Sequence, residues 1–506
     1  MQERSDYNLY ALLASGFPAD RSGCCIDAGE RAWYSWDDVE RASAMIANLL
    51  ARLSLPKGAR IAVQVDKSPE AVLLYLATLR AGCVFLPLNT AYQATEIDYF
   101  VGDAEPSVVV CSPANLGWIE PIARRHRVPH LFTLGDERTG TLLEAAAREP
   151  DRFATVRSRA EDLACIVYTS GTTGRSKGAM LSHANIGSNA LTLHYYWRWR
   201  AGDVLLHMLP IFHVHGLFVA IHGALLSGSR MIWRARFDAK EAIRLLPQAT
   251  VFMGVPTMYV RLLDEPGFDP KACRNMRLFV SGSAPLLSDT FRQFELRTGQ
   301  RILERYGMSE TAMLTSNPYD GNRVAGTVGL PLPGVDVRVV DEQGRPCGTG
   351  EIGAIQVRGP NVFSGYWRMP AKTREEFTAD GFFRTGDMGK WDANGYLTIV
   401  GRSKDLIITG GYNVYPKEIE SYLDEMDGVA ESAVIGVPHR DFGEAVTAVV
   451  VRKSGANLDE GAIVAALKAR IAAFKVPKRV HVVDELPRNA MGKVQKNVLR
   501  ERYGAR

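Results

Sequence analysis

Apolar runs and helically spaced apolar positions alternate through the first two-thirds of the chain. Residues 36–53 place their apolar side chains at helical spacing, and we also expect a helix over residues 68–82. Short apolar runs, which predict buried strands, occupy residues 60–65, 83–88, 107–112, 130–134 and 163–168. Buried strands separated by helices of moderate length are typical of βαβ units. The pattern therefore predicts an α/β fold with parallel sheets covered on both faces.

The pattern changes near residue 320. Residues 334–346, 350–359 and 381–402 contain short strand-like runs separated by turns rich in Gly, Pro and Asp, which predicts a β-rich subdomain of hairpins. A helix is expected next, and the last part of the chain alternates strands and helices again. We expect an α/β multi-domain protein, with a large N-terminal domain (1–401), a hinge (402–404) and a small α+β C-terminal domain (405–506).

Composition agrees with a multi-domain globular protein. The chain has 506 residues, of which 46% are apolar and 23% charged, with a net charge of +4. That charge is too small to point to nucleic acid, and no uncharged apolar run reaches the roughly 18 residues of a membrane span. The seven cysteines are scattered without a C-x-x-C pair, which argues against a disulfide framework and a zinc ribbon. We expect a cytoplasmic protein that binds neither nucleic acid nor membrane.

A glycine- and hydroxyl-rich segment, "YTSGTTGRSKG" (168–178), follows the apolar run 163–168. Glycine lets backbone N–H groups approach phosphate oxygens, hydroxyls add donors, and a lysine adds a point charge. A flexible surface loop is the alternative, because a lone glycine-rich loop is weak evidence. The predicted phosphate-binding residues are Thr169, Ser170, Gly171, Thr172, Thr173, Gly174 and Lys177.

This loop resembles the phosphate-binding signature of the acyl-adenylate-forming enzymes, which include acyl-CoA synthetases, peptide-synthesis adenylation domains and firefly luciferases. Four further segments resemble family motifs in the same order: "ERYGMSE" (304–310), "GFFRTGD" (381–387), "GRSKDLIITGGYNVYPKEIE" (401–420) and "LPRNAMGKVQK" (486–496). The resemblance spans about residues 5 to 505. It implies ATP and Mg²⁺ as cofactors and a mobile C-terminal domain.

The resemblance also implies roles for single residues in adenylation, a reaction that gathers negative charge on phosphate oxygens. Lys493 would bridge the carboxylate and the α-phosphate, Glu310 would hold Mg²⁺ with Thr169, and Asp387 and Arg402 would bind the ribose. The predicted nucleotide segment also includes Arg305, Tyr306 (packed on adenine), Gly307, Met308 and Ser309. Ser309 stands where the family usually has threonine, and it keeps the hydroxyl. Without the motifs, Lys493 could be a solvated lysine, Asp387 a turn residue and Glu310 a capping residue.

The second substrate is expected to be a thiol. The chain ends thirteen residues beyond Lys493, which favours a stand-alone ligase that uses CoA over a peptide-synthesis module with a following carrier domain. By resemblance, Lys404 occupies the hinge, and Gly410 and Gly411 line the tunnel for the thiol arm of CoA. The resemblance further suggests that a lysine acetyltransferase acts on Lys493.

The acid is indicated by polar residues where relatives build the acyl pocket. His213 matches the histidine that flanks this pocket and is a predicted catalytic residue with Lys493 and Glu310, while His207 and His215 share its segment. Arg261 lies in an otherwise apolar helix and could bind a second carboxylate with Ser283. The alternatives are histidines that only pack or gate and an exposed arginine at the helix rim.

Arg305 adds a further cation near this pocket, and an apolar acid would leave such charges stranded. The strings 168–183, 303–311, 315–321 and 474–501 resemble malonyl-CoA synthetases, so we expect malonate as substrate and methylmalonate as a second one. The rivals are a ligase for short- or medium-chain or aryl acids and a nucleotide-binding protein without ligase activity. A membrane-bound fatty-acid activator is disfavoured.

Overall fold

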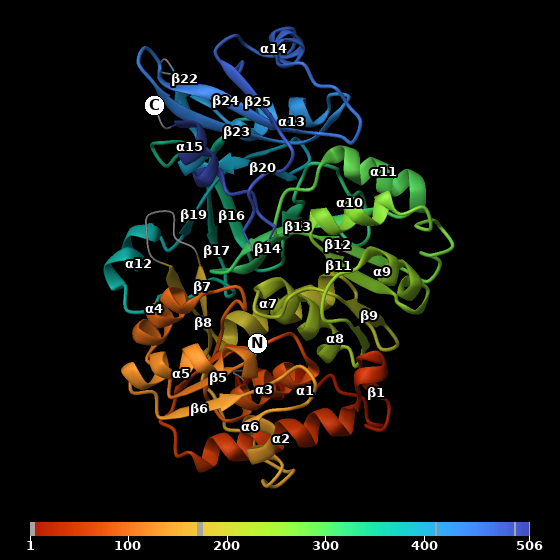
Figure 1. Ribbon diagram of the computed structural model, residues 1–506, viewed down its shortest axis with the longest axis vertical. Coiled ribbons are helices and arrows are strands. Elements are labelled where there is room, and N and C mark those ends of the chain that lie inside the picture. Colours follow the sequence, from red (N-terminus) through yellow and green to blue (C-terminus); the bar gives the residue numbers. More distant parts are fainter. Residues whose placement is uncertain (1–5, 170–175, 410–411, 490–491, 505–506) are drawn as a thin grey trace.

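The structure, a computed structural model, describes residues 6–169, 176–409, 412–489 and 492–504. Figure 1 shows the larger N-terminal part below and the smaller C-terminal part at the other end of the long axis. The described residues form four sheets, two of them largely parallel. This arrangement confirms the predicted α/β multi-domain class.

The first sheet has the strand order β18-β8-β7-β4-β3-β5-β6. Its strands β3 to β7 run parallel wherever they pair, and β8 returns antiparallel beside β7. The predicted helices form here: Ser35 and Asp38 make a reciprocal capping box for α2, and Ser68 caps α3, which begins with a proline. The strands are β3 (Arg60–Gln64), β4 (Val84–Pro87), β5 (Val108–Cys111), β6 (His130–Thr133), β7 (Leu163–Thr169), β8 (Lys177–Ser182) and β18 (Gly365–Tyr366). The helices are α1 (Leu9–Ala14), α2 (Trp36–Arg52), α3 (Pro69–Arg80), α4 (Ala94–Ala104), η2 (Pro113–Asn115), α5 (Leu116–Arg125) and α6 (Thr141–Ala146).

The second sheet has the order β15-β14-β13-β12-β11-β9-β10-β1-β2, with a parallel centre from β13 to β1. Its strands are β1 (Cys24–Asp27), β2 (Trp33–Ser35), β9 (Val204–His207), β10 (Arg230–Trp233), β11 (Val251–Gly254), β12 (Leu278–Ser281), β13 (Ile302–Met308), β14 (Ala312–Ser316) and β15 (Leu330–Pro331). The accompanying helices are η1 (Gly29–Arg31), α7 (His183–Tyr196), η3 (His215–Ile221), α8 (His222–Leu226), α9 (Ala239–Leu245), η4 (Leu246–Gln248), α10 (Pro256–Asp264) and α11 (Ser288–Thr298). Three of its strands lead into predicted site segments, because β9 ends at His207, β12 ends two residues before Ser283, and β13 contains Arg305.

The third sheet is the predicted hairpin subdomain, antiparallel in the order β16-β17-β19-β20. Its strands are β16 (Asp336–Val340), β17 (Gly353–Arg358), β19 (Phe383–Trp391) and β20 (Leu397–Arg402), and helix α12 (Pro370–Glu376) precedes β19. The turn after β16 contains Gly344 at a φ of 79°, a conformation that other residues adopt only with strain.

The C-terminal part is α+β, as predicted, and follows a short helix η5 (Ser403–Asp405). Its sheet holds β21 (Ile407–Thr409), β22 (Tyr412–Val414), β23 (Val429–His439), β24 (Gly443–Arg452) and β25 (Arg479–Val483). Its helices are α13 (Pro416–Asp424), α14 (Glu460–Lys468) and α15 (Lys496–Gly504). Ile419, Leu423, Val446 and Leu467 belong to a hydrophobic core that this part builds for itself.

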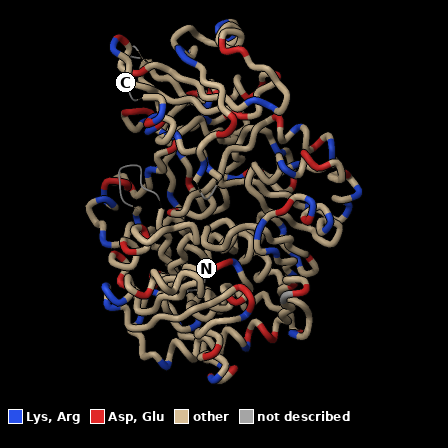
Figure 2. The backbone as a smooth tube through the Cα atoms, in the orientation of Figure 1, with Lys and Arg blue, Asp and Glu red and all other residues tan. Residues whose placement is uncertain are grey.

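Charged residues of both signs are interspersed along the backbone in Figure 2, in keeping with the small net charge of +4. Within the described ranges, no helix combines the length and the apolar character that crossing a membrane requires. All seven cysteines are free thiols.

Candidate active site

The predicted phosphate loop joins two adjacent antiparallel strands. Thr169 ends β7 and Lys177 begins β8, and these two residues face each other in the sheet register. The five predicted residues between them, Ser170, Gly171, Thr172, Thr173 and Gly174, lie outside the described residues. The two described residues, Thr169 and Lys177, are therefore antiparallel neighbours at the ends of their strands.

Glu310 lies in the turn between β13 and β14, directly beside that hairpin. Its carboxylate is buried, and Oε1 accepts hydrogen bonds from Thr169 Oγ1 at 3.4 Å and from Tyr366 Oη at 3.0 Å. Burial raises the pKa of this carboxyl group, and a bound cation would offset that loss of hydration. One carboxylate and one hydroxyl suit Mg²⁺, which retains water and phosphate ligands. The residues present therefore fit the implied metal.

The predicted ribose-binding residues form a cluster in which Asp387 is buried and Arg402 is half-buried. Asp387 on β19 and Arg402 on β20 are register partners, and Arg402 Nε lies 2.7 Å from Asp387 Oδ1. Tyr306 Oη donates to Asp387 Oδ2 at 2.5 Å. The pKa of Arg402 is raised, chiefly by Asp387. Each carboxylate oxygen already has a protein donor, so ribose hydroxyls would use the remaining lone pairs.

Lys493 reaches this cluster from the C-terminal part on a tight turn. Gly492 has a φ of 74°, and the Lys493 backbone N–H donates to Asn489 Oδ1 at 3.0 Å. The residue is exposed, and its ammonium group lies close enough to Arg402, Asp387 and Glu310 to interact with their charges. Loss of hydration is the main cause that lowers its pKa, and Arg402 lowers it further. The turn places the lysine between the ribose cluster and the acyl end.

The acyl end is formed by residues from three segments. Ser283 adopts a left-handed backbone with a φ of 71°, and its Oγ lies 3.3 Å from His215 Nδ1. His213 Nδ1 accepts a hydrogen bond from the His215 backbone N–H at 3.3 Å. Burial, helped by Lys493 and Arg305, lowers the pKa of His213 to about 3, so this histidine is uncharged at neutral pH. Strain at a non-glycine residue is typical of functional sites.

Arg305 on β13 is buried beside this group. It is 3% exposed, and among the described residues neither Nε nor Nη2 has a hydrogen-bond partner. Burial lowers its pKa to about 9. A Cβ on Gly282 would lie 2.4 Å from Arg305 Cζ, so the guanidinium is packed beneath the loop that carries Ser283. An unpaired cation held in this way is ready for an anionic ligand.

The other predicted acid-binding residues lie in different surroundings. His207 is buried behind the acyl end, where its ring stacks on that of Trp233 with 4.7 Å between ring centres. Its Nε2 lies 3.0 Å from the Gly216 carbonyl oxygen. Arg261 is exposed on the last turn of α10 and makes no hydrogen bond or ion pair with the described part of the chain. A Cβ on Gly492 would come within 4.0 Å of Thr257 Oγ1, so the lysine turn approaches the start of α10.

The predicted CoA-binding segment leads into the C-terminal sheet. Lys404 is exposed in η5, whereas Gly410 and Gly411 lie outside the described residues. Ile408 and Tyr412, on the two strands that flank those glycines, are exposed large apolar residues.

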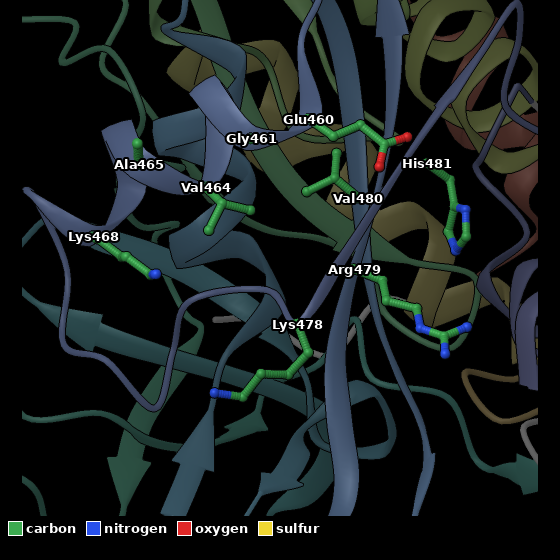
Figure 3. A pocket seen from close by; sticks show the side chains of 9 residues that line it. All are labelled: Glu460, Gly461, Val464, Ala465, Lys468, Lys478, Arg479, Val480 and His481. Atoms are coloured by element: carbon green, nitrogen blue, oxygen red, sulfur yellow. The ribbon is translucent and has the colours of Figure 1, made fainter.

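A separate open groove of about 530 Å³ lies between α14 and β25 (Figure 3). Lys468, Lys478, Arg479 and His481 line it together with Glu460 and apolar residues. It shares no residue with the cluster described above.

Two residues important to the site were not anticipated. Tyr366 donates to Glu310, and its ring lies 4.3 Å from Lys177 Nζ. Gly282 makes room for Arg305. A local sequence signal for either residue is missing, because each contact joins segments that are distant along the chain.

Comparisons with known proteins agree with this geometry. Residues 14–367 match the AMP-binding enzyme family, and residues 418–493 match the AMP-binding enzyme C-terminal domain. A malonate–CoA ligase of Arabidopsis thaliana is 38% identical, covering 88% of this chain and 78% of the relative. A feruloyl-CoA synthase of Amycolatopsis is 34% identical, covering 93% and 94%.

Among solved structures, ATP-bound MatB from Rhodopseudomonas palustris is 55% identical over 99% of both chains, with a TM-score of 0.96. The apo form of MatB, also 55% identical over 99% of both chains, gives a TM-score of 0.86. The fold described here is therefore more similar to the ATP-bound arrangement. The matched regions cover most of the chain and contain Lys177, Glu310 and Lys493, whereas Asp387 and Arg402 lie in the stretch between them. The chain therefore belongs to the AMP-binding enzyme family.

Proposed function

We propose that this chain is a malonate–CoA ligase, which joins malonate to CoA through malonyl-AMP and releases AMP and pyrophosphate. Methylmalonate is proposed as a second substrate. The observation that carries the choice of acid is Arg305, a buried guanidinium beside Ser283 and His215, two of whose nitrogens have no hydrogen-bond partner among the described residues. A dianionic acid would pair with it, whereas an acid with one carboxylate would leave it uncompensated.

In the first half-reaction, the near carboxylate of malonate attacks the α-phosphate of ATP. Lys493 would lie between the two anions and offset the charge that builds up as they approach. Asp387 and Arg402 would hold the ribose, and Lys177 would hold the outer phosphates. Mg²⁺, held by Glu310 and Thr169, would offset phosphate charge when bound. His213, uncharged at neutral pH, would form a neutral wall beside the reacting carboxylate.

The second half-reaction requires Lys493 to leave and a thiol to enter. We propose that residues 402–404 are the hinge between an N-terminal domain (1–401) and a C-terminal domain (405–506). The position of η5 between the last strand of one sheet and the first strand of the next supports this. The exposed side chains of Ile408 and Tyr412 would then turn towards the arm of CoA, near Lys404, Gly410 and Gly411.

The decisive experiment is a steady-state panel of malonate, methylmalonate, succinate, acetate and octanoate with ATP and CoA, read by pyrophosphate release. We expect the highest kcat/KM with malonate and a lower value with methylmalonate. Preference for acetate, octanoate or an aryl acid would replace this proposal with the rival ligase. Absence of pyrophosphate release with every acid would favour a protein that only binds nucleotide.

Two further proposals concern the chain in its cell. Acetylation of Lys493 by a lysine acetyltransferase would remove the charge on which adenylation depends. An acetylated protein of undiminished activity would end that idea. A cytoplasmic location is proposed because all seven cysteines are free thiols.

A further inference from the structure

Lys177 is held by two groups that are not phosphates. Its Nζ lies 3.6 Å from Glu376 Oε1, and both side chains are largely shielded from water. The same Nζ lies 4.3 Å from the centre of the Tyr366 ring. An ammonium group that is partly removed from water in this way keeps its charge balanced by the nearby carboxylate.

The partners of Lys177 come from one short segment. Tyr366 is on β18, which pairs with β8 beside Lys177, and Glu376 ends the helix α12 that follows. Tyr366 also donates its hydroxyl hydrogen bond to Glu310 at 3.0 Å. This segment therefore contacts both the proposed phosphate lysine and the proposed metal carboxylate.

Glu375 and Glu376 are neighbours on α12 that differ in their contact with Lys177. Glu376 Oε1 lies 3.1 Å from Lys372 Nζ as well as close to Lys177. Glu375 Oε2 lies 3.0 Å from the same Lys372 Nζ, but this glutamate is exposed. Of these two glutamates, Glu376 is the one that forms an ion pair with Lys177, so Glu375 serves as a matched comparison.

We propose that Glu376 is a counter-anion that exchanges with pyrophosphate on Lys177. The inference rests on the proposed function, in which Lys177 binds the outer phosphates of ATP. A phosphate group at Lys177 would repel the Glu376 carboxylate, so the lysine leaves Glu376 when ATP binds. When pyrophosphate departs, Glu376 pairs with the lysine again. The competition weakens pyrophosphate binding and speeds its release.

The first test compares Glu376→Gln with Glu375→Gln. Both changes remove a carboxylate that pairs with Lys372, but only the first frees Lys177. Calorimetry with Mg²⁺-pyrophosphate should show about three- to five-fold tighter binding for Glu376→Gln, the size expected for one partly shielded ion pair. Stopped-flow measurement should show slower pyrophosphate release by a similar factor. Glu375→Gln should match the unmodified protein, and melting temperatures establish that both variants are folded.

Unchanged or weaker pyrophosphate binding in Glu376→Gln would overturn the proposal, as would equal tightening in both variants. A double-mutant cycle with Lys177→Gln separates it from the proposed function. If Lys177→Gln alone leaves ATP and pyrophosphate affinity unchanged, the phosphate role of Lys177 is wrong. If Lys177→Gln weakens both ligands and Glu376→Gln changes neither, only the exchange is wrong. If the phosphate role of Lys177 and the exchange with Glu376 are both correct, Glu376→Gln should have no further effect on pyrophosphate affinity in the Lys177→Gln background.

Discussion

Replacing Arg305 with methionine should raise stability and remove malonate activity together. Arg305 is 3% exposed, and two of its N–H groups have no partner among the described residues. Methionine has a similar length, so its side chain can occupy the space beneath Gly282 without a charge. Opposite effects on stability and activity are what a functional cation in an unfavourable environment predicts.

The magnitude follows from the pKa of the guanidinium, which burial lowers from its ordinary value to about 9. The unfolded chain binds this proton more tightly than the folded one, so the free energy of unfolding increases as pH rises above about 9. At neutral pH the buried charge therefore costs about 5 kcal/mol. Lost side-chain contacts offset part of the gain, and we expect Arg305→Met to stabilise the protein by about 1 to 4 kcal/mol.

The same substitution should lower kcat/KM for malonate by roughly 10⁴-fold, because the second carboxylate of malonate would lose its charged partner in a buried site. Malonate should raise the melting temperature of the unmodified protein but not that of the variant. Thermal denaturation with and without malonate, and pyrophosphate release at varied malonate, measure the two effects.

Arg277 provides the matched control. It is also buried, but its Nε lies 2.7 Å from Asp203 Oδ1 and a second nitrogen contacts the other oxygen. Arg277→Met would leave the Asp203 carboxylate uncompensated and should destabilise the protein by about 3 to 5 kcal/mol. If Arg305→Met destabilises to the same extent, or if it keeps normal malonate kinetics, the reasoning about Arg305 is refuted.

Three other predictions address the rest of the site. Lys493→Ala should abolish adenylation while sparing thioester formation from pre-made malonyl-AMP, and equal loss of both half-reactions would contradict the two-conformation proposal. Arg261 is also predicted from the sequence to bind the second carboxylate, but the residue is exposed, so Arg261→Ala should lower malonate use by less than Arg305→Met does, with ATP binding intact. Normal malonate kinetics in Arg261→Ala would leave this residue as an exposed arginine at the helix rim. Thermal stability should fall as pH drops from 6.5 to 4. Burial lowers the pKa of His183 to about 4 and the pKa values of His213 and His222 to about 3. Over this pH range the unfolded chain therefore binds protons that the folded chain does not, which favours unfolding. A melting temperature that stays constant over this range would show that these histidines are protonated at the same pH in the folded and unfolded chain.

Much of the architecture could be predicted from local pattern. The helices predicted over residues 36–53 and 68–82 correspond to α2 and α3, and the change of pattern near residue 320 precedes the antiparallel sheet of β16 to β20. These elements follow from apolar spacing, capping residues and turn residues, which act within a few positions of one another. The order of strands in each sheet was not predictable in this way.

The candidate site also has parts that could be predicted from local sequence and parts that could not. The motifs around Lys177, Glu310, Asp387 and Lys493 are contiguous strings, because each is proposed to bind one part of the nucleotide from a single short segment. They could be identified from the sequence alone. The sequence also indicated an acid with two carboxylates, through cations and histidines near the acyl segment.

Only the tertiary structure distinguished between those cations. Arg305 and Arg261 are both arginines beside apolar residues in sequence, but β13 is a central strand and α10 is a surface helix. One guanidinium is therefore buried beneath Gly282, and the other is exposed to solvent. The contacts of Tyr366 and Glu376 with Lys177 likewise depend on the pairing of β18 with β8, strands separated by almost two hundred residues. Local chemistry determined which groups are available, and the long-range packing of strands decided which of them lose water and which find partners.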